Sequence, residues 1–160
     1  MKFILTVFIL LFTSLMGAQK EKQLVQPDIA IKLLETIKDN AIVLGNGQIE
    51  VHAFIDPLCP MSKRYLDLLY KRNNKIFSKY TIYLYLHEIK SKKSKKHILN
   101  IMSAESRETR LRDIMLSNKK FDLTKANDEK SINIFKKIAE VANKIGVYKR
   151  PYIMINGKVK

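Results

Sequence analysis

Apolar side chains recur at the spacing of one helix face in two long segments, residues 27–40 and 131–145. In the first segment these positions are Ile29, Ile31, Leu33, Leu34 and Ile37. In the second they are Ile134, Phe135, Ile138, Val141, Ala142 and Ile145. Gly146, directly afterwards, is typical of a helix end. Similar spacing predicts helices over residues 61–74 and 98–118, and in the former the expected apolar side is Met61, Tyr65, Leu68 and Leu69.

Short runs of β-branched, aromatic and other apolar residues predict strands over residues 41–44, 49–55, 80–86 and 152–155. Gly45-Asn46-Gly47 joins the first two runs, and such a short glycine-rich link predicts a β-hairpin between them. Helices and strands therefore alternate along most of the chain, with two helical segments in succession between the third strand and the last.

The N-terminus has a separate character. Lys2 precedes fourteen uncharged, mostly apolar residues at positions 3–16, and charged residues return after Ala18. This order is typical of a secretory signal peptide over residues 1–18, so we expect a periplasmic or secreted protein. The apolar stretch is shorter than the roughly 20 residues of a membrane span. Because Met16 is a poor residue three positions before a cut after Ala18, an uncleaved membrane anchor is the alternative.

Length and charge narrow the function classes. The 160 residues suit a single domain, and the formal charge of +15 favours attraction to anionic surfaces or acidic proteins. Nucleic acid is not an expected partner of an exported protein. The basic run over residues 90–97, which begins at Lys90 and ends at His97, is a candidate contact with an anionic membrane surface, and a solvated face is the alternative.

The chain has one cysteine, Cys59, between Pro57 and Pro60 at the predicted junction of a strand and a helix. An odd cysteine in an exported chain indicates a free reactive thiol or an intermolecular disulfide, and a buried inert thiol is the alternative. Asp56 in the same turn is interpreted as a turn cap rather than as a catalytic acid. The three histidines have no metal-ligand spacing with this cysteine, so neither a metal nor another cofactor is expected.

Two sequence segments carry a resemblance to a known family. They are Phe-Ile-Asp-Pro-Leu-Cys-Pro-Met-Ser at 54–62 and Gly-Val-Tyr-Lys-Arg-Pro-Tyr-Ile-Met-Ile-Asn-Gly at 146–157, separated by a helical insert. Together they resemble the thioredoxin superfamily, and most closely the periplasmic Dsb-type thiol:disulfide isomerases and oxidoreductases. The resemblance covers roughly residues 41–158.

The resemblance implies a thioredoxin-like α/β fold of three layers. Residues 41–160 would form the domain, with a helical insert at about 90–125 and residues 19–40 as a helical lead-in. It also implies that Cys59 is the reactive residue within the motif Pro60, Met61 and Ser62. Pro151 would be the family's cis-proline, and Arg150 before it would lie beside the sulfur. Both Arg150 and Pro151 would bind substrate.

The sequence also departs from the family pattern. Ser62 stands where the family usually has its second cysteine, and Arg150 stands where it usually has a small residue. The chain ends soon after Asn156-Gly157, so we expect a fold that lacks the family's last strand and helix, as in a truncated product. Residues 19–40 are also too few to supply the N-terminal dimerisation domain of the isomerase branch.

The chemistry expected at Cys59 follows from these departures. A helix N-terminus favours a thiolate, which is the form that attacks disulfides, and the Ser62 hydroxyl could hydrogen-bond it. Ser62 cannot form a disulfide, so a captured substrate must be released by its own second thiol or by an external thiol reductant. We therefore expect an isomerase or reductase acting on exported proteins with disulfides. The alternative is a non-catalytic peptide-binding or chaperone-like module that has lost redox activity.

Overall fold

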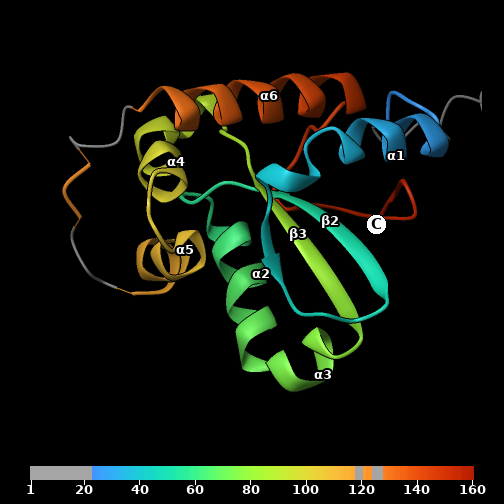
Figure 1. The fold of residues 1–160 in the computed structure, drawn as a ribbon, viewed down its shortest axis with the longest axis horizontal. Coiled ribbons are helices and arrows are strands. Elements are labelled where there is room, and N and C mark those ends of the chain that lie inside the picture. Colours follow the sequence, from blue (N-terminus) through green and yellow to red (C-terminus); the bar gives the residue numbers. More distant parts are fainter. Residues whose placement is uncertain (1–22, 118–120, 124–127) are drawn as a thin grey trace, which may run out of the picture.

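The computed structural model describes residues 23–117, 121–123 and 128–160, so the predicted signal peptide over residues 1–18 lies outside the described residues. The helices are α1 (Pro27–Glu35), α2 (Pro60–Lys71), α3 (Asn73–Phe77), α4 (Lys95–Met102), α5 (Arg107–Leu116) and α6 (Glu129–Ile145), with short 3-10 turns η1 (Lys38–Asn40) and η2 (Lys90–Lys92) (Figure 1). The strands are β1 (Ile42–Leu44), β2 (Ile49–Ile55), β3 (Tyr80–Leu86), β4 (Tyr152–Ile155) and β5 (Lys158–Val159). Among these described residues, no helix is both long and apolar enough to cross a membrane.

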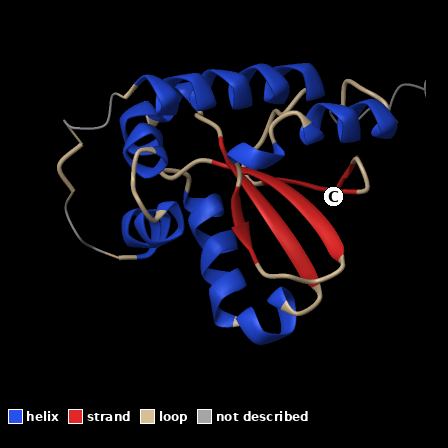
Figure 2. Ribbon diagram, in the orientation of Figure 1, coloured by secondary structure: helices blue, strands red, loops and turns tan. Residues whose placement is uncertain are grey.

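The strands form one sheet in the order β1-β3-β2-β4-β5, with helices on both of its sides (Figure 2). β2 and β3 run parallel at the centre, and the other neighbouring strands pair antiparallel. α1 and α6 lie along one side of the sheet and α2 along the other, which gives three layers (Figure 1). The predicted α/β fold class of three layers is confirmed.

The central strands are buried on both faces, as expected for parallel strands covered by helices. On the α2 side the sheet presents Val51, Ala53, Ile55, Ile82, Leu84 and Leu86, all of them buried. On the α1 side it presents His52 and Phe54 from β2 beside Tyr83 and Tyr85 from β3. The ring of Phe54 contacts those of Tyr85 and Tyr152, so aromatic packing joins three strands on this face.

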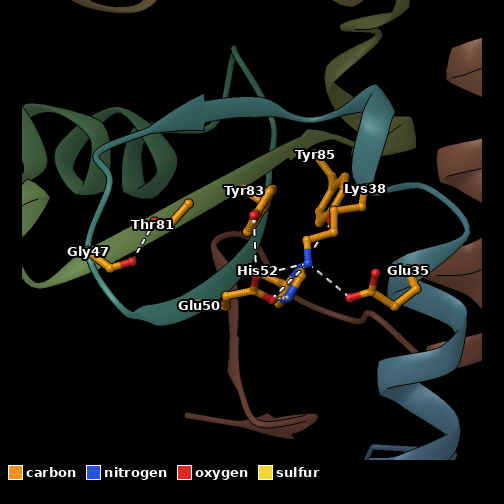
Figure 3. A network of polar contacts seen from close by, with 8 residues as sticks. All are labelled: Glu35, Lys38, Gly47, Glu50, His52, Thr81, Tyr83 and Tyr85. Carbon is orange, nitrogen blue, oxygen red and sulfur yellow. Dashed lines mark hydrogen bonds and ion pairs between the residues drawn. The ribbon is translucent and has the colours of Figure 1, made fainter.

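A polar network on the α1 side ties the N-terminal segment to the sheet (Figure 3). Lys38 Nζ donates to Glu50 Oε1 on β2 over 2.8 Å and to Glu35 Oε1 at the end of α1 over 3.1 Å. The hydrogen bond to Glu50 raises the pKa of Lys38, and the same contact lowers the pKa of Glu50. Deeper in the face, His52 Nδ1 lies 3.0 Å from the Tyr85 hydroxyl. Lys38 is therefore paired with a carboxylate on α1 and with another on β2.

The predicted hairpin between β1 and β2 is wrong. β1 pairs with β3, through Ile42 opposite Leu84, and β3 separates β1 from β2. The link instead passes the end of α3 and the start of β3, and Asn46 N donates to Phe77 O at the end of α3 over 3.0 Å. Gly45 has φ +77°, and a Cβ on it would lie 2.4 Å from Tyr80 O. The glycines thus serve a close backbone approach rather than a hairpin turn.

Two predicted helices are each divided in the structure. The segment predicted over 61–74 forms α2, which ends at Lys71, and the short α3. The segment predicted over 98–118 forms α4 and α5, because Ser106 Oγ accepts from Thr109 N and starts a new helix. Residue 118 of that segment lies outside the described residues, as do positions 118–120 and 124–125 of the predicted insert.

The predicted apolar sides of two helices are partly wrong. On α2, Met61 and Leu68 are 54% and 45% exposed, and Ser62 and Leu66 are buried instead. α2 packs against α5, and its buried side chains are Ser62, Leu66 and Leu69. On α1, Ile29 and Ile31 are exposed and Ala30 and Leu34 are buried.

The prediction that the last strand is missing is also wrong. Asn156 and Gly157 have φ of 51° and 69° and close a tight turn, after which Val159 pairs with Met154. Two residues are enough to form β5 because the Gln23 side chain braces it, accepting from Val159 N and donating to Gly157 O. No helix follows β5 among the described residues.

Substitution of Gly45 tests the close approach of the link to β3. Gly45→Ala places a Cβ against the Tyr80 carbonyl at a positive φ, so we expect the free energy of unfolding to fall by more than about 1 kcal/mol. Urea unfolding of Gly45→Ala and of the control Asn46→Ala, whose side chain is exposed, measures the difference. Equal stability of the two variants would contradict this close approach.

Candidate active site

Cys59 occupies the junction between the central strand β2 and helix α2. Asp56 O accepts from Cys59 N over 3.0 Å and so closes the turn that follows Ile55. Cys59 has extended backbone angles of φ −80° and ψ 121°, and Pro60 holds the first helical position, where its missing N–H leaves no donor unpaired. The thiol therefore lies at the positive end of a helix of 12 residues, and Cys59 is only 7% exposed.

The loop before β4 faces the thiol. Cys59 Sγ donates to Arg150 O over 3.6 Å, although the two residues lie 91 positions apart. The Arg150–Pro151 peptide bond is cis. The antiparallel pairing of β4 with β2, in which Tyr152 lies opposite Phe54, brings this loop to the end of β2 where Cys59 begins α2. Strand register thus brings together Cys59, Arg150 and Pro151.

The Arg150 side chain is spread over main-chain carbonyls rather than paired with an acid. Its guanidinium donates to His87 O, Glu88 O, Val147 O and Lys149 O over 3.2, 3.4, 3.3 and 2.8 Å. Burial lowers the pKa of Arg150 to about 10, and the nearby Asp56 and Cys59 oppose that fall. Within the described residues Arg150 forms no ion pair. The carbonyls therefore hold the guanidinium in place, and no carboxylate contacts it to neutralise its charge.

The other motif residues have two different environments. Ser62 is fully buried, and its Oγ accepts from Asp56 N over 3.2 Å. The expected hydrogen bond from Ser62 to the thiol is not among the contacts of the described residues, because the hydroxyl faces the turn instead. Pro60 and Met61 are exposed beside Cys59, and Arg64 Nη1 lies 3.9 Å from Met61 Sδ. Ser62 therefore braces the turn, whereas Met61 faces solvent.

Asp56 joins the active-site turn to the helical segment that follows β3. Its carboxylate is fully buried, and Oδ1 accepts from Leu58 N over 2.7 Å, as expected of a turn cap. Oδ2 accepts from Ile89 N over 2.5 Å and from the Ser94 hydroxyl over 2.6 Å. These last two contacts were not predicted, since partners 33 and 38 residues away leave no local pattern in the sequence.

Two histidines lie close to the same groups. Burial, and secondarily the charge of Arg150, lowers the pKa of His87 to about 3. Burial also lowers the pKa of His97, while the charge of Asp56 raises it and that of Lys63 lowers it further. The Nδ1 atom of His97 is buried without a hydrogen-bond partner. Across the described part of the chain, no three or more His, Cys, Asp or Glu residues are grouped to hold a metal ion.

Comparison with known proteins supports the fold. No family model and no curated protein sequence matches the chain. Among solved structures, the catalytic domain of Proteus mirabilis ScsC superposes with a TM-score of 0.68 at 18% identity, over 84% of this chain and 89% of that domain. A disulfide interchange protein from Neisseria gonorrhoeae gives 0.54 at 20% identity, over 72% and 79% of the two chains. A periplasmic thioredoxin-like protein from Salmonella enterica serovar Typhimurium gives 0.52 at 15% identity, over 79% and 86%. The chain therefore has a thioredoxin-like fold, as predicted.

Removal of the Asp56 charge tests the role of that residue in the turn. Asn in place of Asp56 turns an amide donor toward groups that themselves donate, so we expect Asp56→Asn to lower the free energy of unfolding by about 2–4 kcal/mol. The matched control is Asp67→Asn on the exposed side of α2, where loss of the ion pair with Lys71 should cost less than about 1 kcal/mol. Urea titration of both variants is the measurement, and similar losses would argue against a bracing role.

The depressed pKa of His87 predicts a loss of stability in acid. Between its unfolded value of about 6.5 and its folded value of about 3, only the unfolded chain binds the proton, so stability falls as pH falls. Over pH 7 to 5 this residue should contribute a loss of about 2 kcal/mol. Unfolding curves of His87→Gln should show a correspondingly flatter pH dependence, and a slope equal to that of the unsubstituted protein would refute the assignment.

Proposed function

We propose that this chain is an exported protein that exchanges disulfides through a single thiol, with Cys59 as the nucleophile. The observation that carries the proposal is the position of the sulfur: at the N-terminus of α2 and 3.6 Å from Arg150 O in the loop before β4. The sequence pattern of residues 1–18 supports export, and the likeness in fold to a disulfide interchange protein supports the reaction class.

Capture of a substrate is the first step. The Cys59 thiolate attacks one sulfur of a client disulfide, a bond forms between the two sulfurs, and the other client sulfur leaves with the electron pair of the broken bond. The sulfur lies at the N-terminus of α2, where the helix presents partial positive charge, and it contacts the loop that carries Arg150. No electron acceptor is needed, because the disulfide is exchanged and not consumed.

The loop before β4 would bind the client backbone. In the thiol form, Cys59 donates to Arg150 O. A thiolate has no proton to donate, so ionisation frees this carbonyl to accept an N–H group from an extended client segment. Pro151 itself has no N–H to compete for acceptors in the client. Exposed Met61 and Tyr148 flank the site and offer apolar contacts to client side chains.

Release of the client is restricted because the chain has no second cysteine to displace it. Cys59 is the only cysteine of the chain, and Ser62 stands three residues further on. A second thiol of the same client can attack its own sulfur in the mixed disulfide, which yields a rearranged client and a free Cys59. Alternatively, two molecules of an external thiol remove the client and then regenerate Cys59, and they leave as one oxidised disulfide. The first route is isomerisation and the second is reduction, whereas net oxidation of a dithiol has no path through this residue alone.

Refolding of a scrambled client separates these routes. With a secreted protein of known disulfides, oxidised at random, we expect recovery of native pairing to be accelerated when a small thiol is present, and Cys59→Ala to abolish the acceleration. Ser62→Cys supplies the missing resolving thiol and should confer oxidation of a dithiol peptide, with Cys59→Ala/Ser62→Cys as its matched control. If Cys59→Ala still accelerated the recovery of native pairing, the proposal would be contradicted.

The 7% exposure of Cys59 and its lack of a partner cysteine favour one other candidate, a peptide-binding module without redox chemistry. In that case the loop at Arg150 and Pro151 would bind extended peptides regardless of the sulfur. Two results together would favour this function. Cys59→Ala would suppress client aggregation as well as the unsubstituted protein does, and neither protein would change the disulfide pairing of the client.

A further inference from the structure

The surroundings of Cys59 carry a marked excess of positive charge. Three segments meet at the active-site turn: residues 56–64, which carry Cys59, residues 87–97, which bind Asp56, and residues 147–151, which contact the sulfur through Arg150 O. Their basic residues are Lys63, Arg64, Lys90, Lys92, Lys93, Lys95, Lys96, Lys149 and Arg150. Their acidic residues are only Asp56 and Glu88. We call these nine basic residues the cationic rim.

The two acidic residues do little to neutralise this rim at the surface. Asp56 is fully buried, and its oxygens are occupied by Leu58 N, Ile89 N and the Ser94 hydroxyl. Its charge offsets part of that of Arg150, which is also largely buried. Glu88 Oε1 accepts from the main-chain N–H of Lys95 and not from a basic side chain. An approaching molecule therefore meets an excess of exposed basic side chains, with Glu88 as the one acidic side chain of these segments that is not fully buried.

Hydrogen bonds attach the segments that carry the rim to the turn of Cys59 and to the loop that its sulfur contacts. Lys63 lies one turn after Cys59 in α2, where Lys63 N donates to Cys59 O, and Lys149 precedes the residue whose carbonyl accepts from the thiol. Residues 90–96 are tethered to Asp56 in the active-site turn by Ile89 and Ser94. Their five lysines are exposed, and Lys95 Nζ lies over the ring of Phe135 on α6. No rim residue forms an ion pair within the described residues, in contrast with Lys38, which pairs with Glu35 and Glu50 at the other end of the sheet.

We propose that Cys59 selects disulfides and thiols with negative charge near the sulfur, such as acidic client segments or small anionic thiols. This inference rests on the proposed thiol exchange and names its substrate class. Attack of a thiolate on an anionic disulfide is normally slowed by repulsion between like charges. A cluster of cations at the site reverses that effect and raises the local concentration of anions, by roughly tenfold to a thousandfold in rate for strongly steered encounters.

A series of small symmetrical disulfides tests this selection directly. The probes are dianionic 3,3′-dithiodipropionate, the neutral disulfide of 2-mercaptoethanol and dicationic cystamine. Each rate of reaction with Cys59 is divided by the rate of free 2-mercaptoethanol with the same disulfide, which removes intrinsic differences in reactivity. At low ionic strength we expect the normalised rate of the anionic probe to exceed that of the cationic probe by at least about tenfold, and the ratio to approach one at 1 M salt.

Charge reversal locates the effect. Lys92→Glu/Lys96→Glu on the rim should lower the anionic-to-cationic ratio several-fold. The control Lys75→Glu/Lys79→Glu makes the same change in net charge around α3, at the far end of α2 from Cys59, and should leave the ratio unchanged (Figure 1). A ratio near one in the unsubstituted protein, or an equal effect of the two double variants, overturns the inference while leaving thiol exchange intact. Failure of all three disulfides to react overturns both proposals.

Discussion

The buried carboxylate of Asp56 is the constraint on which the arrangement around Cys59 depends. A charge fully removed from water must have its acceptor sites filled, and here two N–H groups and one hydroxyl fill them. Those donors come from the active-site turn and from the segment before α4, so satisfying one carboxylate joins the end of β2 to the helical insert. Ser62 adds to the same bracing through the N–H of Asp56 itself. The turn that carries Cys59 is thus anchored before the chain enters α2.

The local features of the site could be predicted from the sequence, and the distant ones could not. Proline after Cys59 and a buried strand before it predict a thiol at a helix N-terminus, because those preferences act over a few residues. The same local reasoning failed at Gly45-Asn46-Gly47, because glycines are favoured both in hairpin turns and where two backbones lie very close. Only the position of β3 between β1 and β2 distinguishes these two roles. Arg150 shows a second limit of prediction from sequence, because its carbonyl, and not its guanidinium, contacts the sulfur. A sequence identifies the residue type but not which of its atoms faces a partner.

Charge is distributed unevenly between the two ends of the central strands. At the start of β2, Lys38, Glu35 and Glu50 pair with one another and hold the N-terminal segment against the sheet. At the end of β2, the basic side chains have no such partners among the described residues, and the one buried acid is occupied by neutral donors. The first arrangement holds the N-terminal segment in place, whereas the second leaves basic side chains without ion pairs on the segments next to Cys59. In the proposed function, this site captures a disulfide and then requires a thiol from outside the chain.

The mixed disulfide is the species that distinguishes this mechanism from both an ordinary two-cysteine exchange and an inert fold. Intact-mass spectrometry follows it directly when the protein is mixed with an excess of a peptide dimer joined by one intermolecular disulfide and the released peptide thiol is then removed by desalting. We expect an adduct at Cys59 that persists after desalting and that disappears, with recovery of the original mass, once a small thiol is supplied. An adduct that never forms, or one that resolves in the absence of any thiol, would contradict the single-thiol mechanism.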